Sequence, residues 1–325
     1  MAKARAIVKR RKAVKNITKI TRTMQMISTA KFQKSLKRAT GTKPYTQKVR
    51  ELVQEVAASI GDVDHPLLRR VTPENRTDRE AVVVLTSDRG LAGAYNGNVM
   101  KLATQLLDEL KSANQIVDLY VAGKKGVSML TFQGRTITQQ IKLGDPPTFE
   151  NAEPVISKLM KQFVDGEIDS VSVVYMNFIS TGVQRPEVTT LLPLAGVDEL
   201  MDRLARDAAE RDHQLQSGVL DAKAHEKTPV AQAETHTVGE VTYDFSPDAL
   251  TLLDELLPLT VKTAYFQTYL DATTSEHVAR MVAMKNATDN AEKMVKSLSL
   301  QYNRARQSQI TTELSEIMGG VEAMG

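Results

Sequence analysis

Residues 14–27 read VKNITKITRTMQMI, and this stretch decides the fold of the chain. Its apolar residues recur three or four positions apart and therefore share one side of an α-helix: Val14, Ile17, Ile20, Met24 and Ile27. The pattern predicts one helix over residues 4–59, with a kink or a short break near Gly41 and Pro44. Basic residues lie mostly off the apolar stripe, so we expect them to face solvent or a partner.

A second stripe with the same spacing lies near the other end of the chain and contains Ala291, Met294, Val295, Leu298, Tyr302 and Ala305. We expect its helix to begin at Ser246-Pro247-Asp248, to bend at Pro258 and to end at Gly319-Gly320. From residue 258 to 318 such a helix would be about 90 Å long. A helix of this length needs a partner along its side to be stable in water.

The two chain ends are therefore expected to pair as a long antiparallel coiled coil. The expected seam residues are Val14, Ile17, Ile20, Ile27, Ala291, Met294, Leu298, Tyr302 and Ala305. We expect scattered charges to cover the outer surface of the pair. This arrangement favours a mechanical part over a catalyst.

The middle of the chain alternates strand and helix patterns. Strands are predicted at residues 81–85, 116–121, 136–141, 171–178 and 188–194, the last of them antiparallel, with helices at 96–111, from Gly123 onward, and at 150–165. Continuous apolar strands separated by helices are typical of a mostly parallel, Rossmann-like α/β sheet. The predicted domains are a helix at 1–59, an α/β domain at 76–245 and a helix at 246–325. A polar insertion at 198–236 and a short strand at 240–245 complete the pattern.

Charge is distributed very unevenly along the chain. Residues 1–50 contain sixteen Lys or Arg and no Asp or Glu, so the other 275 residues hold 26 basic and 39 acidic groups. An acidic or anionic partner is expected near the basic end. Cysteine is absent, which excludes disulfides, thiolate metal sites and a cysteine nucleophile. No run of eighteen apolar residues occurs, so no segment is expected to span a membrane directly.

The sequence offers no catalytic residue, cofactor site or metal site. Residues 87–93, SDRGLAG, follow a strand and precede a helix, where phosphate-binding loops are found. They lack both the Gly-Lys-Ser/Thr of a P-loop and the Gly-x-Gly-x-x-Gly fingerprint, so a structural turn is favoured. None of the five histidines has a metal-binding spacing.

Three other interpretations remain open at this stage. The basic start of the chain could be a mitochondrial transit sequence, although its pattern runs on without a cleavage-like site. It could instead bind nucleic acid, although only Phe32 and Tyr45 supply aromatic rings in the first fifty residues. An enzyme using the turn at Gly90–Gly93 is the third alternative, and it predicts nucleotide or phosphate binding by the chain alone.

Four motifs, in order, resemble the ATP synthase gamma subunit family. They are ITKITRTMQM at 17–26, TSDRGL at 86–91, SEHVARMVAMKNATDN at 275–290 and YNRARQSQITTEL at 302–314. The resemblance covers the chain except for the insertion. It implies a non-catalytic rotor stalk whose paired helices enter a ring of alternating alpha and beta subunits. It also implies that the α/β domain binds the epsilon subunit and the membrane rotor ring of c subunits, on the cytoplasmic face of the cell membrane.

The resemblance assigns roles to individual residues as well. It implies that Arg306, Gln307, Thr311, Glu313 and, on the first helix beside that contact, Met24 contact the beta subunit. It implies that Ile317, Met318 and Val321 occupy an apolar bearing at the top of the ring. Chloroplast members carry a redox-active cysteine pair near the position of the 198–236 insertion, which has no cysteine here. We hypothesise that this insertion limits ATP hydrolysis sterically.

Overall fold

The computed structural model describes residues 2–60, 65–69, 71–142, 144–194 and 249–322. They form two compact units, each of which is built from segments distant in the sequence. The helix-pair unit contains Met1–Phe32, Leu91–Gly93 and His277–Gly325. The sheet unit contains Gln33–Gly90 and Ala94–Glu276. The expected domain limits at 59 and 246 follow the ends of helices, whereas the compact units divide both terminal helices internally.

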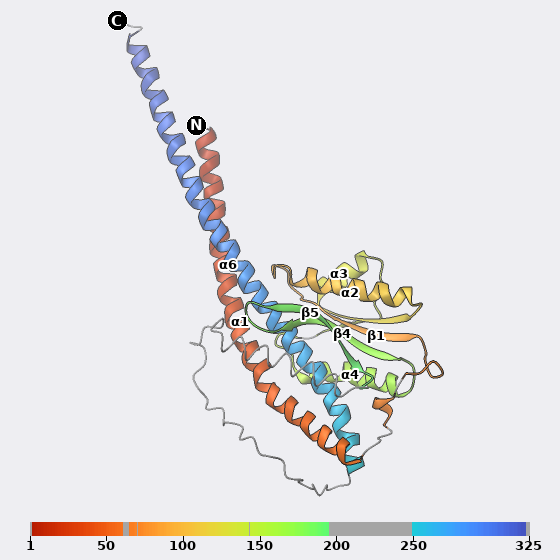
Figure 1. The fold of residues 1–325 in the computed structure, drawn as a ribbon. Coiled ribbons are helices and arrows are strands. Elements are labelled where there is room, and N and C mark those ends of the chain that lie inside the picture. The colour runs from red at the N-terminus through yellow and green to blue at the C-terminus, as the bar shows by residue number, and fades with distance from the viewer. Residues whose placement is uncertain (1, 61–64, 70, 143, 195–248, 323–325) are drawn as a thin grey trace, which may run out of the picture. The chain divides into compact units, whose positions relative to one another are not determined.

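Both terminal helices are longer than the sequence predicted. Helix α1 spans Ala2–Ile60 and continues through Gly41 and Pro44, so the short break that was allowed there does not occur (Figure 1). Helix α6 spans Ala249–Glu322, so the expected end at Gly319-Gly320 is wrong. Two adjacent glycines weaken a helix by only about 2 kcal/mol in total, which a helix of 74 residues tolerates. The predicted start at Ser246, the strand at 240–245 and the insertion at 198–236 lie outside the described residues.

The sheet unit contains a five-stranded sheet in the order β3-β2-β1-β4-β5. Its strands are β1 Arg79–Leu85, β2 Ile116–Ala122, β3 Gln139–Ile141, β4 Ser170–Phe178 and β5 Gln184–Leu192. All neighbours are parallel except β4 and β5, which are antiparallel as predicted. The connecting helices are α2 Tyr95–Ser112, α3 Lys124–Phe132 and α4 Phe149–Val164, and a short turn of 3-10 helix, η1, spans Pro66–Leu68. The expected class, a mostly parallel α/β sheet with two long terminal helices, is confirmed.

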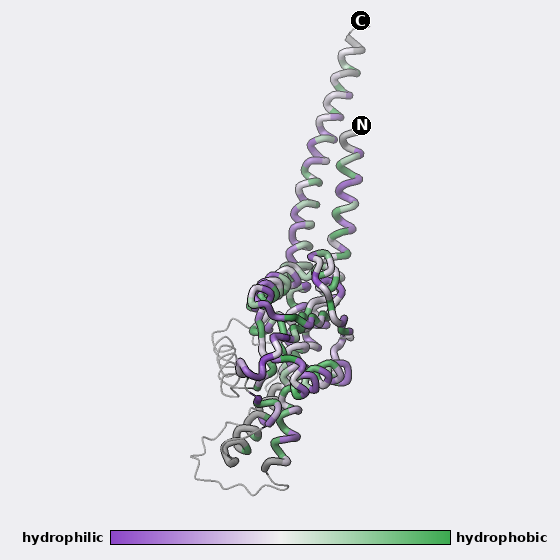
Figure 2. The backbone as a smooth tube through the Cα atoms, turned by 90° about the vertical axis from the view of Figure 1, so that its right-hand side faces the viewer, coloured by the Kyte–Doolittle hydropathy of each residue, from purple (hydrophilic) through white to green (hydrophobic). Residues whose placement is uncertain are grey.

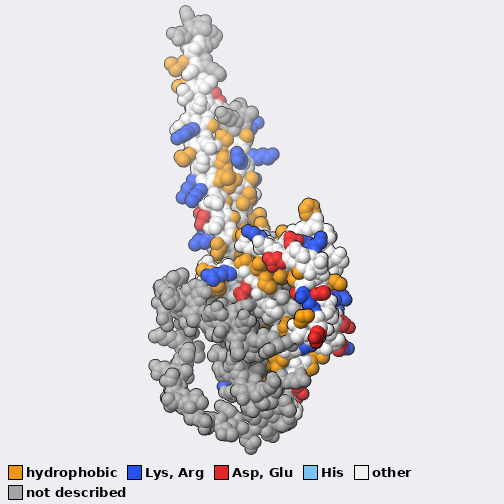
Figure 3. Space-filling model, turned by 45° about the vertical axis from the view of Figure 1, so that its right-hand side comes forward, with side chains coloured by type: hydrophobic (Ala, Val, Ile, Leu, Met, Phe, Trp, Pro, Cys, Tyr) orange, Lys and Arg blue, Asp and Glu red, His pale blue; other side chains and the backbone are white. Residues whose placement is uncertain are grey.

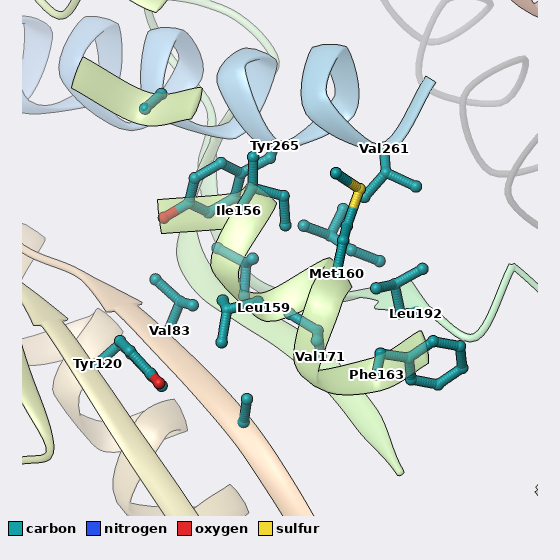
Figure 4. Close-up of a cluster of buried hydrophobic side chains, with 14 of the residues drawn as sticks. Val83, Tyr120, Ile156, Leu159, Met160, Phe163, Val171, Leu192, Val261 and Tyr265 are labelled. Atoms are coloured by element: carbon teal, nitrogen blue, oxygen red, sulfur yellow. The ribbon is translucent and has the colours of Figure 1, made fainter. Parts of the chain in front are cut away.

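Helices cover both faces of this sheet. Figure 1 shows α2 and α3 on one face and α4 on the other. The central strand β1 is apolar from Ala81 to Leu85 because both of its faces are buried there, and Val82, Val83 and Val84 are all fully buried. Figure 4 shows Ile156, Leu159 and other side chains of α4 packed between β-strand residues and the part of α6 that belongs to this unit. The sheet unit therefore has one continuous core made by segments from both halves of the chain.

Two buried tyrosines lie within this core on α6. The rings of Tyr265 and Tyr269 meet edge to face at a centroid distance of 4.8 Å, and their hydroxyl oxygens are 2.6 Å apart. Both side chains are fully buried. Burial raises the pKa of both phenols above the ordinary value of 10, because the ionised form would lose its hydration.

This pair predicts a loss of stability at high pH. Above pH 10 the unfolded chain releases phenolic protons that the folded chain retains, so the free energy of unfolding falls as pH rises from there. Each tyrosine contributes a slope of up to about 1.4 kcal/mol per pH unit. The double variant Tyr265→Phe/Tyr269→Phe is expected to flatten this slope. Urea titrations at pH 8 and pH 11 would measure it, and an unchanged slope in the double variant would contradict the assignment.

Candidate partner-binding surface

In the helix-pair unit, α1 and α6 meet along positions that repeat every seven residues. On α1 the buried or half-buried positions include Ile7, Val14, Thr21 and Ser28, together with Arg11, Thr18, Gln25 and Phe32. On α6 they include His277, Met284, Ala291, Leu298 and Ala305, together with Met281, Thr288, Val295, Tyr302 and Gln309. A seven-residue repeat on both helices is the pattern of a two-stranded coiled coil.

The contacts across this seam show that the two helices run antiparallel. The Thr288 hydroxyl donates to Thr21 Oγ1 over 2.8 Å. Farther toward the chain ends, the guanidinium of Arg11 lies 5.1 Å from the ring centre of Tyr302. Between these contacts, Val14 packs with Ala291 and Leu298, and Ile7 and Val295 are packed against the same cluster. Low numbers on α1 therefore face high numbers on α6.

Several residues expected in the seam lie outside it. Val14, Ala291 and Leu298 are buried there, and Tyr302 and Ala305 are half-buried. Ile17, Ile20, Ile27 and Met294 are instead exposed, by 50%, 60%, 53% and 46% respectively. On α1 the apolar stripe is rotated by about a quarter turn from the seam, since Ile17 precedes the seam residue Thr18 by one position. The correction is that much of the apolar stripe forms the outer surface of the pair.

The outer surface therefore mixes apolar and basic side chains. Figure 3 shows hydrophobic side chains between Lys and Arg on the helix pair, and Figure 2 shows hydrophilic and hydrophobic residues alternating along both helices. The exposed basic residues of α1 include Lys9, Arg10, Lys12, Lys15, Lys19 and Arg22. Arg22 lies 3.9 Å from Glu292 in an exposed ion pair. Exposed apolar residues in rows mark binding surfaces, so the outer face carries apolar side chains in addition to the expected scattered charges.

The residues near the end of α6 are also exposed. Arg306 and Gln307 form no side-chain hydrogen bond or ion pair within the described chain, and both face solvent. The Thr311 hydroxyl donates to the carbonyl oxygen of Gln307 over 3.0 Å, and Glu313 accepts from Gln309 over 2.8 Å. Such bonds within one helix leave the outward side of this segment available to a partner.

The last turns of α6 continue beyond the first residue of α1, as Figure 1 shows. Four large apolar side chains of this tip are exposed by 53–65%: Ile310, Leu314, Ile317 and Met318. Val321 lies in the same helix, but its side chain is outside the described residues. The tip is therefore a single helix that exposes apolar side chains among polar ones.

Met24 lies far from the segment at the end of α6. It is half-buried on α1, close to the level of the Thr21–Thr288 contact, whereas Arg306 lies beyond the level of Tyr302. The eighteen residues from Thr288 to Arg306 correspond to about 27 Å along a helix. The structure therefore does not bring Met24 beside Arg306 and Gln307, and the surface contains two separate zones.

The turn after β1 is held by its own polar groups. The Asp88 carboxylate accepts from the backbone N–H of Lys124 over 3.0 Å, at the start of α3. The Ser87 N–H donates to the Asn96 side chain over 3.0 Å, and the buried Thr86 hydroxyl donates to the Ala122 carbonyl oxygen over 2.7 Å. Since the polar groups of this turn are bonded to other groups of the chain, the geometry supports a structural turn.

Other chemistry has little basis in the described residues. Within them, no group of three or more acidic or histidine side chains is placed to hold a metal ion. Among the helices that the structure describes, none has an apolar stretch long enough to cross a membrane. Of the histidines, His65 accepts from the backbone N–H of Leu67 and caps η1, and His277 is buried.

The polar seam residues Thr18, Thr21, Gln25 and Ser28 were missed by the sequence reasoning. Apolar periodicity selects the most hydrophobic stripe, and these four residues are polar. The signal that could have found them is the strict interval of seven in the series Ile7, Val14, Thr21 and Ser28, which matches an interval of seven on α6.

Comparison with known proteins covers the whole chain. A family model described as ATP synthase matches residues 3–324. The ATP synthase gamma chain of Rhodopirellula baltica is 39% identical, over 100% of this chain and 99% of its own. The ATP synthase gamma chain of Leptospira biflexa is 35% identical, over 100% of both chains.

A solved structure has the same fold. A chain in the OSCP/F1/c-ring structure of the Euglena gracilis mitochondrial ATP synthase superimposes with a TM-score of 0.61 at 18% identity, over 99% of this chain and 95% of that chain. The match to the family and to these relatives thus extends over nearly the whole chain. This chain therefore belongs to the ATP synthase gamma chain family, the central rotor stalk of the F-type ATP synthase.

Proposed function

We propose that the helix-pair unit transmits rotation between the ion-driven ring of c subunits and the catalytic head of alpha and beta subunits. In this function the chain performs no bond chemistry and couples ion flow to ATP synthesis mechanically. The observation that carries the proposal is the surface of the helix pair. Its apolar residues Ile17, Ile20 and Ile27 face outward among basic residues, while small and polar residues form much of the seam.

Such a surface suits a shaft that is enclosed by partners. Exposed apolar rows favour contact with a surrounding ring, and the unbalanced positive charge of α1 attracts acidic loops without requiring a fixed geometry. We assign Arg306, Gln307, Thr311 and Glu313 to contact with the beta subunit, and Met24 to a second contact zone. The apolar tip with Ile317, Met318 and Val321 would lie in an apolar bearing.

The remaining partners and the location follow from the same proposal. The sheet unit would bind the epsilon subunit and the ring of c subunits. The chain would then be a peripheral protein on the cytoplasmic face of the cell membrane, as part of the ATP synthase complex. The alternative of nucleic-acid binding through residues 1–50 has no support among the relatives, and the outward apolar stripe gives it no advantage.

Co-expression with alpha and beta subunits tests the proposal directly. A tagged chain is expected to co-purify with both subunits, and ATP hydrolysis is expected only in that assembly. A chain that binds DNA with a steep salt dependence, but captures neither subunit, would favour the nucleic-acid alternative.

Replacing Arg306 and Gln307 by alanine tests the assigned contact. Both side chains are exposed, so the stability of the chain should change by less than about 0.5 kcal/mol. Loss of charge-assisted hydrogen bonds to a partner should lower ATP hydrolysis of the assembled complex by roughly tenfold or more. Lys293→Ala, an exposed residue of the same helix, is the matched control. Equal activity of the two variants would remove Arg306 and Gln307 from the contact.

A further inference from the structure

Packing in the helix-pair unit is dense at one end. The large buried apolar side chains there are Phe32 on α1 and Val278 and Met284 on α6, and all are at most 7% exposed. The Ala92 side chain, from the turn after β1, is 2% exposed and belongs to the same unit. This end of the unit therefore has buried apolar side chains from three separate segments of the chain.

Packing becomes sparse beyond the Thr21–Thr288 contact. We call residues 5–20 of α1 and 289–315 of α6, which lie beyond it, the distal segment. Among its described residues, three apolar side chains are buried: Val14, Ala291 and Leu298. Two more are partly buried against these three, namely Ile7 and Val295. A helix in water is held mainly by tertiary packing of its apolar face, so this segment has little to hold its helices together.

Two further contacts join the helices in or beside the distal segment, and both are weak. Arg22 lies 3.9 Å from Glu292, but their side chains are 70% and 48% exposed, and exposed ion pairs contribute little to stability. The Arg11 guanidinium lies 5.1 Å from the Tyr302 ring centre, an attraction that is small where water has access. These contacts therefore add little to the small apolar cluster.

Three large apolar side chains beside the seam remain in water. Ile17, Ile20 and Met294 are 50%, 60% and 46% exposed. Opening of the distal segment would expose only a small additional apolar area, while the opened helices would gain conformational freedom. A ring that encloses both helices would cover these side chains only while the helices lie together. Such covering favours the closed pair by mass action.

We propose that the distal segment opens repeatedly in the free chain and that enclosure by partner subunits keeps it closed. This inference rests on the proposed function, because the partners that would enclose the segment are the alpha and beta subunits. In the free chain, the densely packed end keeps the two helices together while the distal segment opens. The helix pair then becomes a stiff shaft only within the assembly.

Hydrogen exchange of the full chain, read by mass spectrometry, tests the opening. Two stretches of the same helix are compared, residues 278–284 in the densely packed end and 291–305 in the distal segment. In the free chain, the backbone amides of 291–305 should exchange at least about tenfold faster, after correction for the intrinsic rates of the two sequences. Equal exchange rates of the two stretches would overturn the proposal.

Arg11→Leu tests whether seam packing limits the opening. Arg11 is half-buried in the seam, so leucine there adds apolar contact to the closed pair and should slow exchange of residues 291–305 in the free chain by roughly fivefold. Lys12→Leu is the matched control, because Lys12 is exposed at the next position of α1. Arg, Lys and Leu have similar helix propensities. Equal exchange in the two variants would contradict the proposal, since fraying of helix ends alone does not depend on the seam.

The assembled complex tests the role of the partners. Exchange of residues 291–305 should slow by at least about tenfold when the parent chain assembles with alpha and beta subunits, and the difference between the parent and Arg11→Leu should disappear. Exchange as fast as in the free chain would overturn the proposal. A chain that captures neither subunit would instead refute the proposed function, and exchange in the free chain would still decide whether the distal segment opens.

Discussion

Gly123→Ala is expected to destabilise the sheet unit by about 3–5 kcal/mol. Gly123 has a φ of +89°, a conformation that residues with a side chain rarely adopt. A Cβ at this position would lie 2.1 Å from the carbonyl oxygen of Thr86. That oxygen belongs to the backbone after β1, which cannot move without breaking the bonds of the turn. The loss is a large part of the 5–15 kcal/mol that stabilises a typical domain.

Gly134→Ala is the matched control for this substitution. Gly134 also has a positive φ, +73°, but nothing lies within 4 Å of the position its Cβ would take. Alanine there should cost only the backbone strain, about 1–2 kcal/mol. Urea titrations followed by far-ultraviolet circular dichroism would compare the two variants. Similar midpoints for both would mean that the backbone relaxes around Cβ of residue 123 and that close packing against Thr86 is unimportant.

Leu298→Asp is expected to open the helix pair. Leu298 is 5% exposed and packs with Val14 and Ala291, so the substitution removes its apolar contacts and introduces a buried charge. These effects together should destabilise the helix-pair unit by about 3–5 kcal/mol. Limited proteolysis should then cleave residues 1–32 much faster than in the parent chain. In the assembled complex, ATP hydrolysis should no longer be coupled to rotation of the chain.

If the outer stripe binds partners, Ile20→Asp is expected to leave the free chain stable and to impair the assembled complex. Ile20 is 60% exposed, so this charge should change the stability of the free chain by less than about 0.5 kcal/mol. The same charge should lower the activity of the assembled complex, because it would be buried against a partner. Equal protease sensitivity of Ile20→Asp and Leu298→Asp would show that Ile20 belongs to the seam after all.

The fold was largely predictable because its strongest signals are local. The strand predicted at 171–178 corresponds to β4, Ser170–Phe178, since a run of apolar residues buried on both faces has few alternatives. The short β3, Gln139–Ile141, begins three residues after the predicted start. Apolar patterning marks it weakly, since Gln139 and Gln140 are polar and exposed. Gly319-Gly320 was read as a stop, although glycine weakens a helix and does not forbid it.

The candidate site was predicted less well, for a physical reason. Sequence periodicity reports which residues avoid water and does not report whether the chain itself or another subunit covers them. Ile17 and Ile20 are apolar and yet exposed, whereas Thr21 and Ser28 are polar and buried. The structure of this chain distinguishes the residues that the chain itself covers from those that it leaves exposed. The role of Arg306 could come only from the family resemblance, because an exposed arginine on a helix has no distinctive pattern of its own.

The joining of the two chain ends has a consequence for biosynthesis. Residues 1–32 leave the ribosome before residues 33–276, and their partner from His277 onward is made only after both. At 5–20 residues per second the first helix waits for roughly 10–50 s. During that interval the first helix has no long apolar seam to shield, because water readily hydrates its seam residues Thr18, Thr21, Gln25 and Ser28. Its outward isoleucines remain accessible to chaperones. Synthesis of the segment from His277 onward is therefore the event that permits the helix pair to close, and a product that stops before His277 would lack the pair.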